Sequence, residues 1–167
     1  MKIFAGLLFS FLLFSGITTD QVRLSFKKAR NSEEAAIAFN ELMQKEMNIN
    51  VNLKNAYLGA SEIMLADYGS NIPQKIKLFK AGRDKLEVAV LAEPKSFEIR
   101  FIRLIIQKKT PDFLRYKSNI EEDKKFILDN YADMVTNANS PKSLKHFVED
   151  INKDLNIFSP EEMNQRK

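Results

Sequence analysis

The segment from Phe97 to Gln107 constrains the fold more than any other part of this sequence. At helical spacing, its apolar side chains cover an arc of about 220° around the helix axis. Only Arg100, Arg103 and Gln107 remain as a narrow polar stripe. A helix that is apolar over most of its circumference must pack against neighbours on several sides. We therefore expect this helix at the centre of a helical bundle.

Helical spacing also recurs through the rest of the chain after Asp20. Strict apolar–polar alternation over strand length is missing there, and so are the Asn-Gly and Asp-Gly pairs typical of hairpin turns. Capping residues and helix breakers delimit helical segments at about residues 22–30, 32–47, 53–68, 73–93, 97–107, 119–135 and 140–155. We predict an all-α fold, a single domain over residues 20–158 with six or seven helices in antiparallel hairpins, followed by a polar tail over 159–167.

The first 19 residues have the pattern of an export signal. Lys2 is followed by an uncharged, mostly apolar run from Ile3 to Ile17, and polar residues then lead to Asp20. This run of 15 residues is shorter than the roughly 20 that a helix needs to cross a bilayer. Its length and flanks suit a secretory signal peptide over residues 1–19. We predict cleavage between Ser15 and Asp20 and a periplasmic or secreted protein, with an uncleaved N-terminal anchor as the alternative.

Composition excludes several kinds of site. The chain has no cysteine and a single histidine, which rules out disulfides, thiolate zinc sites and multi-histidine metal clusters. The 26 lysines and arginines exceed the 22 acids by four, and this excess is dispersed, without a run of five like charges. We therefore expect no metal, no cofactor and no nucleic-acid partner. Membrane contact is expected only through residues 1–17, if they stay uncleaved.

Residues 82–94 resemble the second helix of a tetratricopeptide repeat. The small, larger apolar, small and closing proline positions of that family are held here by Gly82, Leu86, Ala89 and Pro94. Leu58-Gly59 is similar to the Leu-Gly pair of the family's first helix. The resemblance covers about 40 residues and implies a tetratricopeptide-like hairpin without a second copy along the chain. The whole chain is also similar to small exported all-helical proteins of bacteria.

Gly82 lies in the interior of a predicted helix, where a glycine needs a physical explanation. A glycine in a helix interior costs about 1 kcal/mol relative to alanine. A close crossing with the helix at 53–68, which carries Gly59, would account for it. We therefore expect these two helices to approach each other closely at their glycines.

Charged side chains interrupt the expected apolar faces at four positions. They are Asp67, Arg83, Arg100 and Arg103. A buried charge must be paired or hydrogen-bonded, because an isolated one costs several kcal/mol. One interpretation is an internal network that joins Asp67, or an acid from residues 121–123, to an arginine. The alternative is a pocket in which Arg100 and Arg103 bind a carboxylate or phosphate, helped by Tyr57.

The local motifs of nucleotide-binding, zinc-protease and serine-hydrolase sites are missing from the sequence, and no catalytic residue is assigned. We therefore predict a non-enzymatic protein-interaction or adaptor module of the bacterial envelope, with an unknown protein partner. The alternative is a binder of an apolar or anionic small molecule between helices, which 13 phenylalanines and six methionines favour. A second, less favoured alternative is a hydrolase that uses His146, oriented by Asp150. A closed cavity of several hundred Å³ would favour the ligand binder, and an open concave apolar groove would favour a protein partner.

Overall fold

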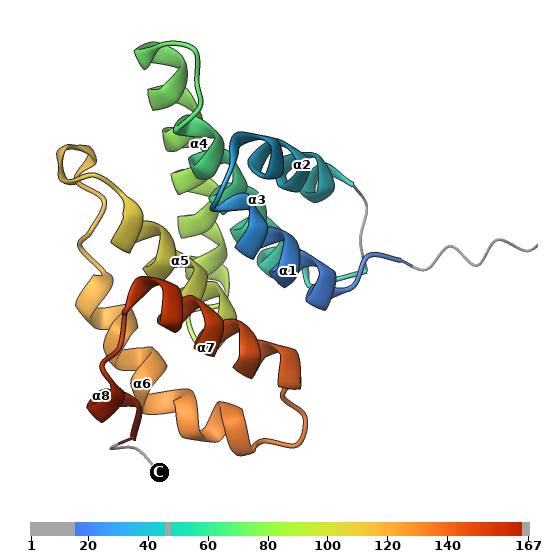
Figure 1. Ribbon diagram of the computed structural model, residues 1–167, viewed down its shortest axis with the longest axis vertical. Coiled ribbons are helices and arrows are strands. Elements are labelled where there is room, and N and C mark those ends of the chain that lie inside the picture. Colours follow the sequence, from blue (N-terminus) through green and yellow to red (C-terminus); the bar gives the residue numbers. More distant parts are fainter. Residues whose placement is uncertain (1–15, 46–47, 165–167) are drawn as a thin grey trace, which may run out of the picture.

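Eight α-helices and one 3₁₀ turn make up the part of the chain that the computed structural model describes, residues 16–45 and 48–164 (Figure 1). In chain order they are α1 (Thr19–Ala29), α2 (Glu33–Gln44), α3 (Val51–Ala66), α4 (Ile72–Ala92), α5 (Phe97–Lys109), η1 (Asp112–Leu114), α6 (Ile120–Thr136), α7 (Lys142–Leu155) and α8 (Pro160–Asn164). No strand occurs in these residues, which confirms the all-α prediction. Within the same ranges, no helix combines the length and apolarity that crossing a bilayer requires.

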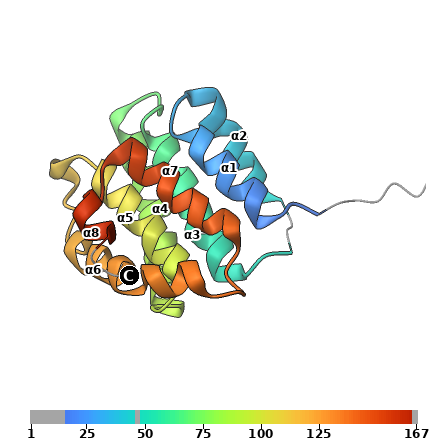
Figure 2. The same cartoon turned by 60° about the horizontal axis from the view of Figure 1, so that its bottom comes forward.

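α5 lies in the middle of the bundle, as its sequence predicts. Every residue from Glu98 to Gln107 is buried. Figures 1 and 2 show α5 between the α3–α4 pair on one side and α6 and α7 on the other. The ring of Phe101 illustrates this position, because its centroid lies 5.7 Å from that of Phe147 in α7 and 6.4 Å from that of Phe158. Neighbouring elements therefore cover both the apolar arc and the polar stripe of this helix.

Edge-on aromatic contacts join α1 to three other helices. The ring centroid of Phe26 lies 5.9 Å from that of Phe39 in α2, 5.5 Å from that of Tyr57 in α3 and 5.7 Å from that of Phe147 in α7. All four rings are buried. Aromatic pairs in this geometry contribute about 0.5–1.5 kcal/mol beyond the area that they bury. The cluster therefore fixes the N-terminal helices against the C-terminal half of the chain.

α3 and α4 form an antiparallel pair that crosses at two glycines. The amide of Asn52, at the start of α3, donates to Glu93 Oε1 beyond the end of α4 at 2.8 Å. At the crossing, a Cβ built on Gly59 would lie 2.5 Å from the carbonyl oxygen of Gly82, and one built on Gly82 would lie 2.4 Å from that of Gly59. Such a short separation leaves no room for a side chain. The close crossing expected from the sequence is confirmed.

The last segment of the chain differs from its prediction. α8 forms within residues 159–167, which were expected to be a polar tail, and it brings the described α-helices to eight instead of six or seven. The hydroxyl of Ser159 accepts a hydrogen bond from the backbone N–H of Glu162 at 3.2 Å. Glu162 also pairs with Lys124 of α6 at 2.8 Å. A local cap and an ion pair to a distant helix thus order this segment, and composition alone reveals neither.

The first helix begins inside the segment predicted to be an export signal. α1 starts at Thr19 rather than at residue 22 because Thr18 and Gln21 form a capping box. The backbone N–H of Gln21 donates to Thr18 Oγ1 at 3.3 Å, and that of Thr18 donates to Gln21 Oε1 at 2.8 Å. Residues 1–15 of the predicted signal lie outside the described residues. Export therefore stays a prediction.

The glycine crossing makes a direct prediction. Gly82→Ala should destabilise the protein by about 1–3 kcal/mol, because the new methyl group overpacks against the backbone of α3. Without the crossing, the same change in a helix interior would stabilise the protein by up to about 1 kcal/mol. Urea unfolding followed by circular dichroism measures the difference, with Lys80→Ala at an exposed position of α4 as the control. A Gly82→Ala protein as stable as the parent would contradict the crossing.

Candidate functional site

Two arginines of α5 share one buried carboxylate from α6. Asp123 has no exposed surface. Its two oxygens accept from Arg100 Nε at 2.7 Å, from Arg103 Nε at 2.6 Å and from Arg103 Nη2 at 2.8 Å. The arginines lie three residues apart on one stripe of α5, and Asp123 lies in the first turn of α6, which packs on that stripe. Charge-assisted hydrogen bonds such as these are roughly twice as strong as neutral ones.

Two further acids pair with these arginines. Glu122 accepts from Arg100 Nη2 at 2.5 Å, and Glu87 of α4 accepts from Arg103 Nη1 at 2.9 Å. Burial lowers the pKa of Arg103, but its hydrogen bonds and the charges of Asp123 and Glu87 outweigh this effect and raise the pKa above its ordinary value. The acids of the protein therefore neutralise both guanidinium groups. This geometry supports the internal-network hypothesis over a ligand pocket at Arg100 and Arg103.

A second buried network contains Tyr57, which the sequence placed beside the arginines of α5. Arg23 of α1 donates to Glu98 through Nε at 2.8 Å and through Nη2 at 2.6 Å. The hydroxyl of Tyr57 donates to Glu98 Oε1 at 2.6 Å. Burial and the Glu98 charge raise the pKa of Tyr57 well above its ordinary value. The signal for this network is Glu98 itself, a charge inside the apolar arc of α5, but nothing in the sequence identifies Arg23 as its partner.

Two other residues singled out in the sequence lie at the surface. Arg83, expected within the buried stripe of α4, keeps 38% of its side chain exposed and pairs with its neighbour Asp84 at 2.8 Å. It therefore does not interrupt a buried face. His146 is exposed on α7, and Asp150, its expected partner, accepts a hydrogen bond from Lys27 of α1. This arrangement gives the hydrolase alternative no support.

A pocket of about 500 Å³ opens between α3, α4, α5 and the segment that follows α5. Its wall is mainly apolar and includes Ile63 and Met64 of α3, Phe79 of α4, and Ile105 and Ile106 of α5. The first turns of α4, which line one side, project beyond the neighbouring helices (Figure 1). Pockets for small ligands are typically about 300–1,000 Å³ and apolar, with a few placed polar groups. Both the size and the lining fit this class.

Four charged side chains line this pocket, namely Arg30, Asp67, Lys75 and Lys109. The side chain of Arg30 is only 10% exposed, and Nη1 lies 3.6 Å from Oδ2 of Asp154, which is itself 57% exposed. Arg30 Nε is buried and has no hydrogen-bond partner. Burial lowers the pKa of Arg30, and Asp154 offsets this only in part. Unlike the arginines of α5, this guanidinium retains unused capacity to donate to an anion.

Asp67 is the residue singled out in the sequence that does line the pocket. It is exposed and follows the last turn of α3. Partial burial raises the pKa of its carboxylate, and the charge of Lys75 acts in the opposite direction. Arg30 was not predicted, because it ends the expected helix at 22–30, where a basic residue is an ordinary complement to the helix dipole. No sequence pattern distinguishes such a residue from one that faces a pocket.

Within the described residues, no group of three or more histidine, aspartate or glutamate side chains is placed to hold a metal ion. Comparison of the chain with protein-family models, curated proteins and solved structures finds no match. The function is therefore inferred from the geometry of the pocket and from its charges.

The network around Asp123 predicts a large loss of stability from a nearly isosteric change. Asp123→Asn leaves Arg100 and Arg103 with no buried counter-charge between them. Breaking a buried ion pair in this way costs about 3–5 kcal/mol. Urea unfolding measures the loss, and Glu121→Gln, an exposed acid two residues earlier in the same turn, is the matched control. Equal stabilities of the two variants would show that the network does not hold the core together.

Proposed function

We propose that the protein is a non-enzymatic binder of a small amphipathic anion. The apolar part of the ligand occupies the pocket between α3, α4 and α5, and its anionic group accepts hydrogen bonds from Arg30. The observation that carries the proposal is Arg30, a guanidinium whose side chain is only 10% exposed, which lines a mainly apolar pocket and has only a 3.6 Å contact with an exposed acid. Its volume of about 500 Å³ lies within the range typical of pockets for small ligands.

The charges around the pocket support an anion rather than a cation. Arg30, Lys75 and Lys109 contribute three positive charges to the lining, and Asp67 contributes one negative charge. An anion at Arg30 would add a counter-charge to a guanidinium whose ion pair with Asp154 is 3.6 Å long, in surroundings where burial strengthens the interaction. An apolar tail on the same molecule would fill the space beside Ile105 and Phe79. A carboxylate or phosphate with a single alkyl chain has both features.

We retain export as part of this proposal, on the pattern of residues 1–19. The chain has no cysteine, so outside the cytoplasm it must be stable without disulfides. The two buried arginine–acid networks and the aromatic cluster supply that stability without any redox chemistry.

A second candidate function is the protein-interaction module predicted from the sequence. Two large apolar side chains of α4, Val88 and Leu91, are 58% and 79% exposed. The glycine crossing of α3 and α4 supports the similarity to tetratricopeptide hairpins, which present helix faces to partner proteins. A photo-crosslinking amino acid at position 91 would join a discrete protein in cells if this function holds. The same amino acid at Lys142, an exposed position on α7, is the control.

The ligand-binding proposal predicts that dodecanoate, below its micelle concentration, binds the purified protein in calorimetric titrations. Arg30→Gln should weaken binding by about 10- to 100-fold, the usual effect of losing a hydrogen bond to a charged group. Asp67→Asn should tighten binding, because it removes the one negative charge in the lining. Lys28→Gln, an exposed neighbour of Arg30 with the same change in charge, should leave binding unaltered.

Two further titrations keep this proposal falsifiable if Arg30→Gln proves unstable. Ala66→Phe places a large side chain in the pocket wall and should abolish binding while the helical circular dichroism spectrum persists. Dodecyltrimethylammonium, which has the same chain and the opposite charge, should bind more weakly than dodecanoate. Equal binding of the two amphiphiles, or no binding of dodecanoate to the parent, would overturn the proposal.

A further inference from the structure

Two segments that meet at the pocket carry more positive charge than the whole chain. Residues 72–80 form the first half of α4, and residues 107–117 run from the end of α5 through η1. Their basic residues are Lys75, Lys77, Lys80, Lys108, Lys109, Arg115 and Lys117. With one acid, Asp112, the net charge of these segments is 7 − 1 = +6, whereas the whole chain has 26 − 22 = +4.

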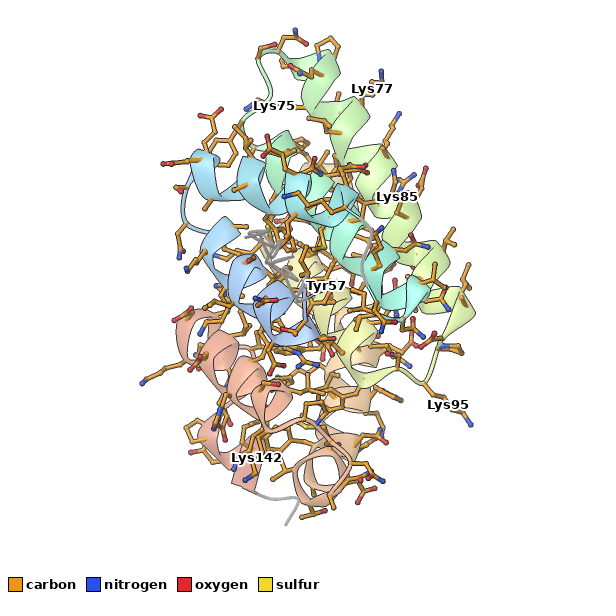
Figure 3. The ribbon with its side chains drawn as sticks, turned by 90° about the vertical axis from the view of Figure 1, so that its right-hand side faces the viewer. Tyr57, Lys75, Lys77, Lys85, Lys95 and Lys142 are labelled. Atoms are coloured by element: carbon orange, nitrogen blue, oxygen red, sulfur yellow. The ribbon has the colours of Figure 1, made fainter. Side chains whose placement is uncertain are left out.

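The remainder of the chain is therefore slightly acidic, with 19 basic and 21 acidic residues and a net charge of −2. Both segments contribute lining residues to the pocket, so the fold brings their charges to one end of the molecule. Figure 3 shows Lys75 and Lys77 at this end, whereas Lys95 and Lys142 lie toward the opposite one. The excess of positive charge, which is dispersed along the sequence, is thus concentrated at one end of the folded protein. The two segments are separated along the chain, which is why no run of like charges reveals it.

Large apolar side chains are exposed among these charges. Phe113 of η1 is 80% exposed, Ile72 at the start of α4 is 72% exposed, and Ile76 one turn later is 39% exposed. All three also line the pocket. Isolated exposed apolar residues are common, but a group of them inside a cationic surface marks an interaction site. We call the exposed surface of residues 72–80 and 107–117 the mouth surface.

We propose that the mouth surface docks on a lipid bilayer with anionic headgroups. The lysines and Arg115 attract the negative membrane surface, an interaction worth about a fivefold gain in affinity per basic residue that acts within about 8 Å at physiological salt. Phe113 and Ile72 then enter the boundary between headgroups and acyl chains. Residues 1–17 were expected to supply the only membrane contact, and the mouth surface adds one within the folded domain.

This inference rests on the proposed function and gives it a source of ligand. Phe113 and Ile72, the side chains that would enter the bilayer, also line the pocket, so an alkyl chain could pass between membrane and pocket without crossing water. An anionic amphiphile of the membrane, such as a single-chain lipid, is therefore the expected class of ligand. An acidic protein or a nucleic acid would use the lysines but would leave the apolar opening of the pocket unexplained.

A tryptophan reporter tests which residue enters the membrane. The chain contains no tryptophan, so Phe113→Trp and Leu91→Trp each introduce a single fluorophore. The two positions are matched, with 80% and 79% exposure in the native protein. With vesicles of equimolar phosphatidylglycerol and phosphatidylcholine, emission should shift to shorter wavelength for Phe113→Trp only. Vesicles of phosphatidylcholine alone should produce no shift at either position.

Matched charge variants test the electrostatic part. Lys80 and Lys108 belong to the mouth surface without lining the pocket, so Lys80→Gln/Lys108→Gln should retain dodecanoate binding. Its affinity for the anionic vesicles in flotation assays should fall by about 25-fold at low salt, at about fivefold per lysine. Lys95→Gln/Lys142→Gln has the same change in charge at the opposite end and should bind vesicles like the parent.

The outcomes separate this inference from the proposed function. Absence of vesicle binding at low salt, or equal weakening in both charge variants, would overturn the docking, while dodecanoate titrations without vesicles still test the pocket. A blue shift at position 91 instead of 113 would overturn it as well. Vesicle binding through Phe113 with no uptake of dodecanoate would overturn the proposed function and leave the docking surface standing.

Discussion

The carboxylate of Asp123 makes it possible for α5 to be covered on all sides. The apolar arc of this helix would bury itself in any bundle, but its polar stripe brings two guanidinium groups with it. An unpaired charge in such surroundings costs several kcal/mol. One fully buried carboxylate, which accepts three hydrogen bonds from Arg100 and Arg103, removes that cost. α6 can then pack on the stripe, and the other helices follow around the central one.

The same principle separates the arginines of the two buried networks from Arg30, which we propose binds the ligand. The fold pairs a carboxylate with each of three buried arginines, Arg23, Arg100 and Arg103. Arg30 is comparably enclosed, yet it has only a 3.6 Å contact with an exposed carboxylate and a buried Nε without an acceptor. It lines the pocket together with Lys75 and Lys109, which belong to the two basic segments of the chain. The anionic group of an amphiphile would pair with the guanidinium of Arg30. An anionic bilayer would attract the basic residues of the mouth surface.

The sequence is informative where local pattern decides the structure. The apolar arc of α5 and the glycines of the α3–α4 crossing both follow from spacing and backbone sterics, and the fold class follows from the spacing repeated along the chain. Pairings between distant segments are different. Arg23 meets Glu98 across 75 residues, and no local signal links the two. The pocket was missed for the same reason, because its wall residues have ordinary core patterns and the opening depends on how far α4 extends beyond its neighbours.

Native-state amide hydrogen exchange is the most direct test of the central position of α5. If neighbours cover the helix on every side, the amides of Ile102 and Ile105 exchange only when the whole protein unfolds, and their opening free energy equals that from urea unfolding. The exposed start of α4, around Lys77, should exchange by local opening at a lower free energy. Amides of α5 that exchange as readily as those around Lys77 would contradict the account.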